Sequence, residues 1–158
     1  MPQTDGHMTS KHSTLEVSSD QVSAVGNVTT WTDISGSSNA LTPSGGDHMT
    51  GYTHSFGEFH DPLTGIGKVE PASVVARAIY TEEDEESTDL FQGFYENETR
   101  IWMRYRPAGA GAGNWEYIFH GHVVGPCIPS SDATTADILL VEATLWGVYK
   151  GRLGQGTT

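Results

Sequence analysis

The sequence is poor in cysteine and in basic residues. One cysteine, Cys127, stands among 158 residues, which excludes an intrachain disulfide framework and a zinc site built from several cysteines. Eight Lys and Arg residues face twenty Asp and Glu residues, so the formal net charge is −12 at pH 7. A chain this acidic repels phosphate groups, which argues against a basic surface that grips nucleic acid or an anionic membrane.

Long apolar segments are missing as well. No stretch approaches the roughly 18 consecutive apolar residues of a membrane-spanning helix. Residues 1–13 are polar and lack the apolar centre of a secretory signal. We therefore expect a soluble intracellular product in which Cys127 is a small buried apolar residue.

The length is typical of one domain. Residues 1–12 and 151–158 are rich in small polar residues and glycine without periodicity, which is typical of flexible ends. We predict a flexible N-terminal arm over 1–12, a single β domain over 13–150 and a flexible C-terminal tail over 151–158.

Turn residues divide this domain into short segments that alternate with a period of two, as β-strands do. Two long segments, 48–59 and 69–80, are expected to pair as a projecting hairpin around a loop at His60–Lys68. The absence of alternating strands and helices argues against doubly wound folds. The predicted fold class is mainly β, a β-sandwich or partly closed barrel with one short helix and a long projecting hairpin. The expected strands are 14–18, 28–34, 40–42, 48–59, 69–80, 99–106, 115–126 and 136–146.

An acidic segment surrounds the predicted helix. Residues 82–98 contain eight of the twenty acids and no basic residue. Apolar residues within it recur at helical spacing, which predicts a helix over 88–96. The run Glu82–Glu86 is interpreted first as a solvated lead-in to this helix, with a docking or metal-binding surface as the alternative. It lacks the spaced ligand pattern of a calcium loop.

No motif predicts catalysis. His120 and His122 would point the same way on a strand, but a metal site needs a third ligand, and His48, His54 or His60 would have to supply it from a distance. Surface or hydrogen-bonded histidines are the preferred interpretation. The glycine-rich stretch Gly109–Gly113 lacks the basic and hydroxyl residues of a phosphate loop and is expected to be a turn. We expect no enzyme activity, no catalytic residue, no cofactor and no metal.

The order of several segments is more specific. The run Trp31-Thr32-Asp33-Ile34-Ser35-Gly36 is followed by Ser44-Gly45-Gly46, by the weakly polar strand Gly51–Phe56 and by Gly67-Lys68-Val69-Glu70-Pro71, which leads into 74–80. This order resembles the major tail tube protein of long-tailed, non-contractile bacteriophages. The similarity covers residues 15–150.

The resemblance implies a structural virion protein that assembles with itself. Subunits would close into hexameric rings with a continuous inner β-barrel, and stacked rings would form the viral tail tube through which DNA passes during ejection. The implied partners are other copies of the chain, tape-measure and tail-end proteins, and DNA only as transient cargo, with no membrane. The implied location is the virion tail, assembled in the host cytoplasm.

The resemblance also suggests two sets of interaction residues. The tip of the hairpin would reach the adjacent ring, and basic residues on strand 99–106 would pair between subunits with the acidic segment; a basic strand face without specific pairing remains the alternative. The ring-stacking residues are Phe59, His60, Asp61, Pro62 and Leu63, and the charge-pairing residues are Arg104 and Arg106 with Glu82, Glu83 and Glu85.

Two other function classes remain open at this stage. A monomeric β-sandwich binding module for carbohydrate or calcium would use Trp31, Trp102 or Trp115 as a sugar-stacking surface. A small hydrolase would use His120 or His122.

Overall fold

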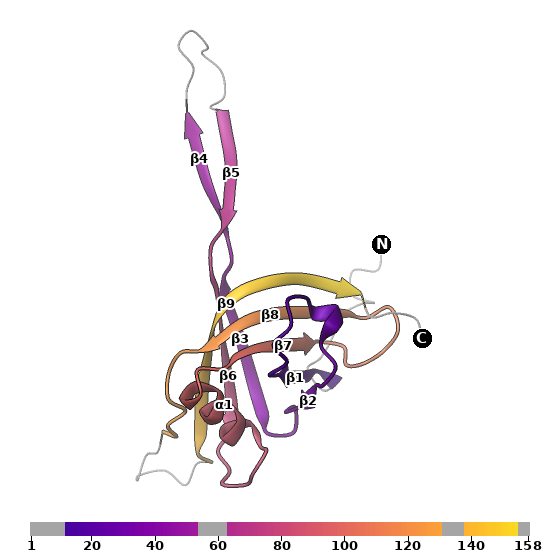
Figure 1. The fold of residues 1–158 in the computed structure, drawn as a ribbon, viewed down its shortest axis with the longest axis vertical. Coiled ribbons are helices and arrows are strands. Elements are labelled where there is room, and N and C mark those ends of the chain that lie inside the picture. Colours follow the sequence, from indigo (N-terminus) through magenta and orange to yellow (C-terminus); the bar gives the residue numbers. More distant parts are fainter. Residues whose placement is uncertain (1–11, 54–62, 131–137, 155–158) are drawn as a thin grey trace, which may run out of the picture.

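The computed structural model describes residues 12–53, 63–130 and 138–154 (Figure 1). In these residues the fold is mainly β, with one α-helix, as the sequence predicts. The strands are β1 (Thr14–Ser18), β2 (Thr32–Asp33), β3 (Ser38–Gly45), β4 (His48–Thr53), β5 (Leu63–Val69), β6 (Ala72–Ile79), β7 (Arg100–Arg106), β8 (Trp115–Val123) and β9 (Leu140–Gly154); the helices are the 3-10 turn η2 (Val25–Asn27) and α1 (Ser87–Glu96).

Seven strands form one antiparallel sheet in the order β2-β1-β7-β8-β9-β6-β3, and β4 and β5 form a second, two-stranded sheet. The large sheet has two free ends, so it is sandwich-like and not a closed barrel. The 15-residue strand β9 joins its halves, pairing with β6 over Leu140–Gly147 and with β8 over Leu145–Gly154. Figure 1 shows β9 curving through the body as it passes from one pairing to the other.

The close approach of the paired strands β8 and β9 depends on two glycines. Gly121 and Gly147 lie opposite each other in the register. A Cβ on Gly121 would collide with the Trp146 carbonyl, and one on Gly147 would collide with the His120 carbonyl. Only glycine lets the two backbones approach this closely, so the pair fixes where the sheet bends.

The core lies between the bent sheet and α1. Alternation along β6 and β9 places Val74, Ala76 and Ala78 on one face with Val141, Ala143 and Leu145, and all six are buried. We call this the core face; Phe91 of α1 joins the same buried cluster. Strand residues with the other parity lie on what we call the opposite face. Leu139 lies within the strand expected over 136–146, but it is 37% exposed and precedes β9.

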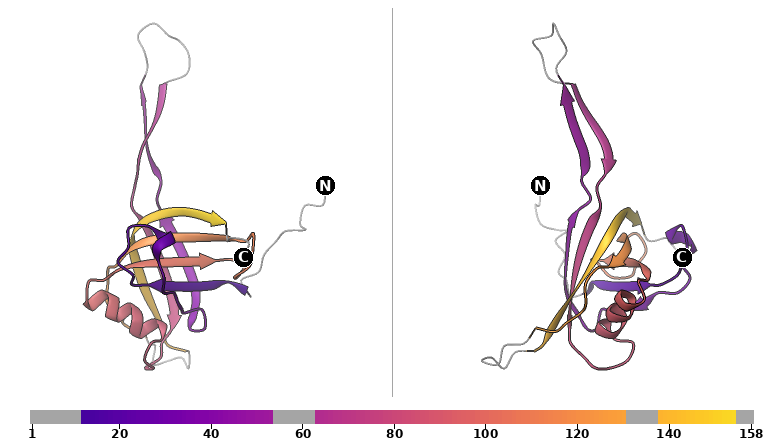
Figure 2. Two further views of the ribbon diagram at one scale, coloured as in Figure 1. Left: turned by 45° about the vertical axis from the view of Figure 1, so that its right-hand side comes forward. Right: turned by 60° about the vertical axis from the view of Figure 1, so that its left-hand side comes forward.

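The predicted pairing of 48–59 with 69–80 is wrong, because His48 pairs with Val69 and β6 pairs with β3. The hairpin is therefore longer at its base than predicted. β3 continues into β4, and β5 into β6, as one twisted pair of strands that rises out of the body (Figure 2). Backbone hydrogen bonds bridge the junction, from Gly46 N to Pro71 O at 3.2 Å and from Glu70 N to Asp47 O at 2.8 Å. Gly45 and Gly46 have φ of 72° and 80°, which glycine adopts without strain.

Several predicted boundaries need correction. The loop expected at His60–Lys68 is wrong from residue 63 onward, because Leu63–Val69 pairs with β4 as β5. The C-terminal tail expected over 151–158 begins too early, since Gly151–Gly154 continue β9 against Trp115–Ile118. Residues 155–158, and the arm 1–12 apart from His12, lie outside the described residues.

The strand predicted at 28–34 is largely replaced by a loop. Only Thr32–Asp33 is a strand, and η2 precedes it. The Asp20 carboxylate accepts hydrogen bonds from the backbone N–H groups of Thr29 and Thr30 at 2.7 and 3.1 Å. Because these donors are satisfied by a side chain, the segment turns away from the sheet ladder. These bonds also lower the pKa of Asp20.

Other predicted strands have different bounds: 40–42 is part of β3 at 38–45, the strand expected over 115–126 ends at 123, and the strand expected over 136–146 begins at 140 and continues to 154. The strand expected over 99–106 is β7 at 100–106. β1 has the predicted bounds, and the predicted helix 88–96 is α1 at 87–96. The stretch Gly109–Gly113 lies in the β7–β8 connection, as expected for a turn. No helix in the described part of the chain has the length and apolar composition needed to span a membrane.

Candidate functional site

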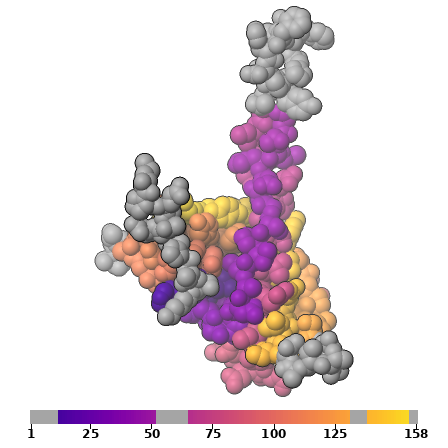
Figure 3. Space-filling view, turned by 180° about the vertical axis from the view of Figure 1, so that it is seen from behind, coloured from indigo at the N-terminus to yellow at the C-terminus, as the bar shows by residue number. Residues whose placement is uncertain are grey.

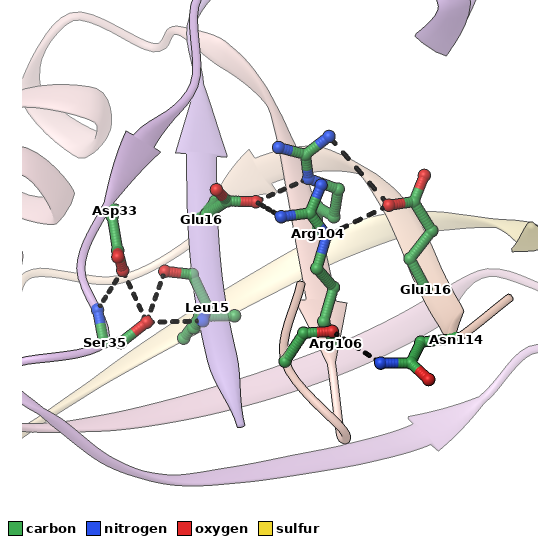
Figure 4. A network of polar contacts seen from close by, with 9 residues as sticks. Leu15, Glu16, Asp33, Ser35, Arg104, Arg106, Asn114 and Glu116 are labelled. Carbon is green, nitrogen blue, oxygen red and sulfur yellow. Dashed lines mark hydrogen bonds and ion pairs between the residues drawn. The ribbon is translucent and has the colours of Figure 1, made fainter. Parts of the chain in front are cut away.

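The Trp-x-Asp-Ile-Ser-Gly run forms β2 and the start of the turn after it, and it holds the neighbouring elements together (Figure 4). Asp33 Oδ1 accepts a hydrogen bond from Ser35 N at 2.9 Å, and the Ser35 hydroxyl accepts one from Leu15 N of β1 at 2.8 Å. Ile34 is 3% exposed and belongs to the core cluster. The motif therefore anchors the β2–β3 connection against β1.

The same turn holds the start of α1. The Ser87 hydroxyl donates to Ile34 O at 3.3 Å and contacts the Ser37 hydroxyl, and both serines are buried. Two buried hydroxyls that satisfy each other and a carbonyl fix the helix against the sheet. The Trp31–Gly36 run, which carries part of the resemblance, thus has a direct structural role in the fold.

Arg104 and Arg106 lie in a compact ionic network on the opposite face of the sheet (Figure 4). Arg104 Nε lies 2.6 Å from Glu16 Oε2, and Arg106 Nε lies 3.1 Å from Glu116 Oε2. Cross-contacts at 3.2 and 3.9 Å close the network, and all four side chains are 13–15% exposed. The Arg104 guanidinium also lies 4.1 Å from the ring centroid of Trp31.

This network changes the interpretation of the predicted charge pairs. The structure pairs Arg104 and Arg106 with carboxylates of their own chain, and it does not bring Glu82, Glu83 or Glu85 to them. Those three glutamates are exposed, in the segment that leads into α1. The inter-subunit pairing with Arg104 and Arg106 stays a prediction, but these arginines are already neutralised by Glu16 and Glu116, which the sequence did not single out as partners.

The hairpin exposes its side chains on both faces. Met49 of β4 is 57% exposed, and Ile66 and Val69 of β5 are 76% and 46% exposed. Figure 3 shows this part of the chain standing clear of the body. Leu63 is the first residue of β5 and lies opposite Thr53, whereas Phe59, His60, Asp61 and Pro62 lie outside the described residues.

The β3–β6–β9 part of the opposite face is polar and carries balanced charge. Arg77 of β6 and Glu142 of β9 form an ion pair through Nε and Oε1 at 2.9 Å, with each side chain about half exposed. Thr42 and Ser44 of β3 and Trp146 of β9 are exposed on this face. β3 is also an end strand of the sheet, so one of its edges is unpaired within the described chain.

The two adjacent histidines share the opposite face, as predicted, but they differ in environment. His120 is 8% exposed and stacks on Trp102 with ring centroids 3.8 Å apart, whereas His122 is exposed. Burial, together with Arg100, Lys150 and His122, lowers the pKa of His120 to about 4. Among the described residues, no three His, Cys, Asp or Glu side chains are grouped as metal ligands. His54 and His60 lie outside these residues.

The remaining candidates, the cysteine and the three tryptophans, are buried or packed against other side chains of the chain. Cys127 is buried as expected, and burial raises the pKa of its thiol to about 11, so it is a poor nucleophile. Trp102 is 1% exposed and offers no face to a sugar. Trp31 lies under Arg104, and Trp115 has the Arg152 guanidinium 3.9 Å from its ring centroid.

Comparison with known proteins gives no family for the chain: no family profile matches the sequence, and no curated protein matches it significantly.

Proposed function

We propose that this chain is a structural subunit that assembles with itself into stacked rings, and that these rings form the tail tube of a long-tailed bacteriophage virion. The proposal joins the sequence resemblance to one structural observation, the projecting hairpin. On this proposal the rings are hexameric, DNA passes through them as transient cargo, and the further partners are tape-measure and tail-end proteins.

The hairpin carries the proposal because it has too little support of its own. A two-stranded β-hairpin is at best marginally stable in water without a third strand or a packed face. The described side chains of β4 and β5 are exposed, including Met49 and Ile66, and the strands extend beyond the sheet (Figure 2). Contact with another copy would bury these apolar side chains and give the hairpin strands new partners.

The body supplies a second feature suited to ring closure. β3 leaves an edge of the large sheet open, and pairing between copies would remove that edge. On this proposal the β3–β6–β9 part of the opposite face lines the channel. The part of this face formed by β3, β6 and Leu140–Gly147 of β9 carries one cation, Arg77, and Glu142 neutralises it, so this part of the face has no free cation to hold DNA.

The proposal is tested by electron microscopy of the concentrated full chain with two matched variants. Wild type and Ile66→Val, which keeps an apolar side chain, are expected to form rings or tubes of uniform diameter. Ile66→Asp is expected to remain monomeric, because a charge at this position would be buried in the contact. A wild-type chain that stays monomeric at all concentrations would overturn the proposal.

A further inference from the structure

The chain contains a basic cleft that no part of the ionic network uses. The cleft has a volume of about 370 Å³ and lies between the β1–β2 connection and strands β7, β8 and β9. Its lining contains no carboxylate and consists of Gln21, Val22, Ser23, Arg100, His120 and Lys150. In a chain with a net charge of −12, a cleft with two cations and no acid is an unusual concentration of positive charge.

Of the Lys and Arg residues in the described chain, Arg100, Lys150 and Lys68 have no ion-pair partner and lie over no aromatic ring, and Lys68 belongs to β5 of the hairpin. Arg77, Arg104 and Arg106 form ion pairs, and Arg152 lies over Trp115. Arg100 and Lys150 are exposed and form no ion pair within the described residues. Arg100 also borders a neighbouring cleft with Asp89 and Glu98, but neither acid is within ion-pair distance of it.

The complementary charge is exposed elsewhere on the same chain. The acids Glu82, Glu83, Asp84 and Glu85 are exposed, and they have no cation partner among the described residues. They lie in the segment between β6 and α1, away from the β1–β2 connection that covers the cleft (Figure 1). One copy of the chain therefore offers an unpaired acidic segment and an unpaired basic cleft on separate surfaces.

We propose that the cleft bordered by Arg100 and Lys150 receives the acidic segment Glu82–Glu86 of a second copy. This inference rests on the proposed function and assigns to it a specific contact between subunits. The contact joins two different surfaces, so it is heterologous and repeats from copy to copy, as a ring or a stack requires. In this contact the acidic segment of the second copy pairs with Arg100 and Lys150, and not with Arg104 and Arg106 as the sequence suggested.

The surroundings of the cleft favour an anionic occupant. Arg100 and Lys150 place positive charge near His120, and burial together with these charges lowers the pKa of that ring. Beside it, the indole N–H of Trp102 is buried without a hydrogen-bond partner, and the Ser23 side chain adds a hydroxyl at the rim. Carboxylates would neutralise the two cations and accept hydrogen bonds from them.

The contact can be located by zero-length carbodiimide cross-linking of the assembled full chain, because this reaction joins a lysine amine directly to a carboxylate. The sequence has three lysines, Lys11, Lys68 and Lys150, so the products are easily assigned. A mixture of isotopically labelled and unlabelled chains shows whether a cross-link is intermolecular. The expected product joins Lys150 of one chain to residues 82–86 of another; assembled chains that yield cross-links from the other lysines only would overturn the inference.

Charge reversal tests the same contact by its energetics. Arg100→Glu with Lys150→Glu, or Glu82→Lys with Glu83→Lys and Glu85→Lys, is expected to raise the concentration needed for assembly by about tenfold or more. A mixture of the two reversed chains, or one chain with all five changes, should regain assembly. Circular dichroism melts control for folding, since all five side chains are exposed.

The outcomes separate this inference from the proposed function. If wild type and the Arg100→Glu, Lys150→Glu chain assemble at the same concentration, the cleft contact is wrong while self-assembly stands. If the reversed chains lose assembly and their mixture does not regain it, the pairing of these two surfaces is also wrong. If wild type does not assemble at all, both proposals fail.

Discussion

The body and the hairpin of this chain are both built from antiparallel strands, but they differ in how far the side chains of those strands are buried and paired. In the body, most apolar strand residues on the core face are buried, and polar groups such as Ser87 and Arg104 have partners in the same chain. In the hairpin, the described side chains of β4 and β5 are exposed, and the strands pair with each other. The body therefore has a buried core of its own, whereas the described part of the hairpin has none.

This difference in burial indicates which substitutions should affect folding and which should affect association. A surface that is already satisfied contributes to stability, and changes there act on folding. A surface that is exposed, apolar and extended costs little to change in the isolated chain, and changes there act on association. The following experiments exploit this contrast, in order of decreasing effect on the stability of the monomer.

The largest effect is expected from matched glycine substitutions in the two regions. Gly121→Ala places a Cβ against the backbone of Trp146 and Gly147, which cannot yield as a side chain could, so we expect a loss of about 3 kcal/mol in the free energy of unfolding. Gly51→Ala in β4 meets nothing within 4 Å and should change stability by less than about 1 kcal/mol. Urea unfolding measures both; equal losses would contradict the contrast between body and hairpin.

A smaller effect is expected from the ionic network. Arg104→Met leaves two carboxylates, Glu16 and Glu116, with one cation, Arg106. Because all four side chains of the network are only 13–15% exposed, the variant should lose about 2–3 kcal/mol in the free energy of unfolding. Arg77→Met breaks an ion pair of about half-exposed side chains and should cost less than about 1 kcal/mol. Thermal or urea unfolding of the two variants gives the comparison, and the reverse order would show that the network is not structural.

The buried His120 should make the stability of the chain depend on pH. Its pKa is lowered from 6.5 to about 4 in the folded chain, so protonation favours the unfolded chain, and the stability contribution present above pH 6.5 is lost as the pH falls toward 4. His120→Phe keeps a ring against Trp102 but cannot be protonated, so between pH 6.5 and 4 it should lose less stability than wild type. His122→Phe, at an exposed position on the same face, is the control; it removes the smallest contribution to the lowered pKa of His120 and should lose nearly as much stability as wild type. Parallel profiles for wild type and His120→Phe would contradict this account.

The smallest effect on the monomer is expected in the hairpin. Ile66 is 76% exposed, so Ile66→Asp should alter the free energy of unfolding of the dilute chain by no more than about 0.5 kcal/mol. Urea unfolding at low protein concentration measures it, with Ile66→Val as the matched control. A loss of several kcal/mol would show that the hairpin already packs within the monomer.

The sequence predicts much of the body because its patterns are local. Alternation predicts β1 with its observed bounds, and helical spacing predicts α1 to within a residue. What it missed depends on contacts distant in the chain. The loop at 28–31 is shaped by Asp20, and Gly151–Gly154 are ordered into β9 by Trp115–Ile118.

The interaction residues were harder to predict for the same reason. Basic residues at 104 and 106 are visible in the sequence, but only the pairing of β1, β7 and β8 shows that Glu16 and Glu116 neutralise them. The same pairing shows that Arg100 and Lys150, which no motif marks, are the cations left beside the cleft. Composition gives the number of charges, and tertiary register decides which of them remain free.

The proposed assembly requires that other copies of the chain complete the hairpin. Hydrogen exchange of the backbone amides, followed by mass spectrometry in dilute and in concentrated full-length protein, tests it most directly. We expect the amides of 48–53 and 63–69 to exchange rapidly in the dilute chain and slowly in the concentrated one, while those of β6, β8 and β9 stay protected in both. Hairpin amides that exchange at the same rate at every concentration, in a body that stays protected, would contradict the claim.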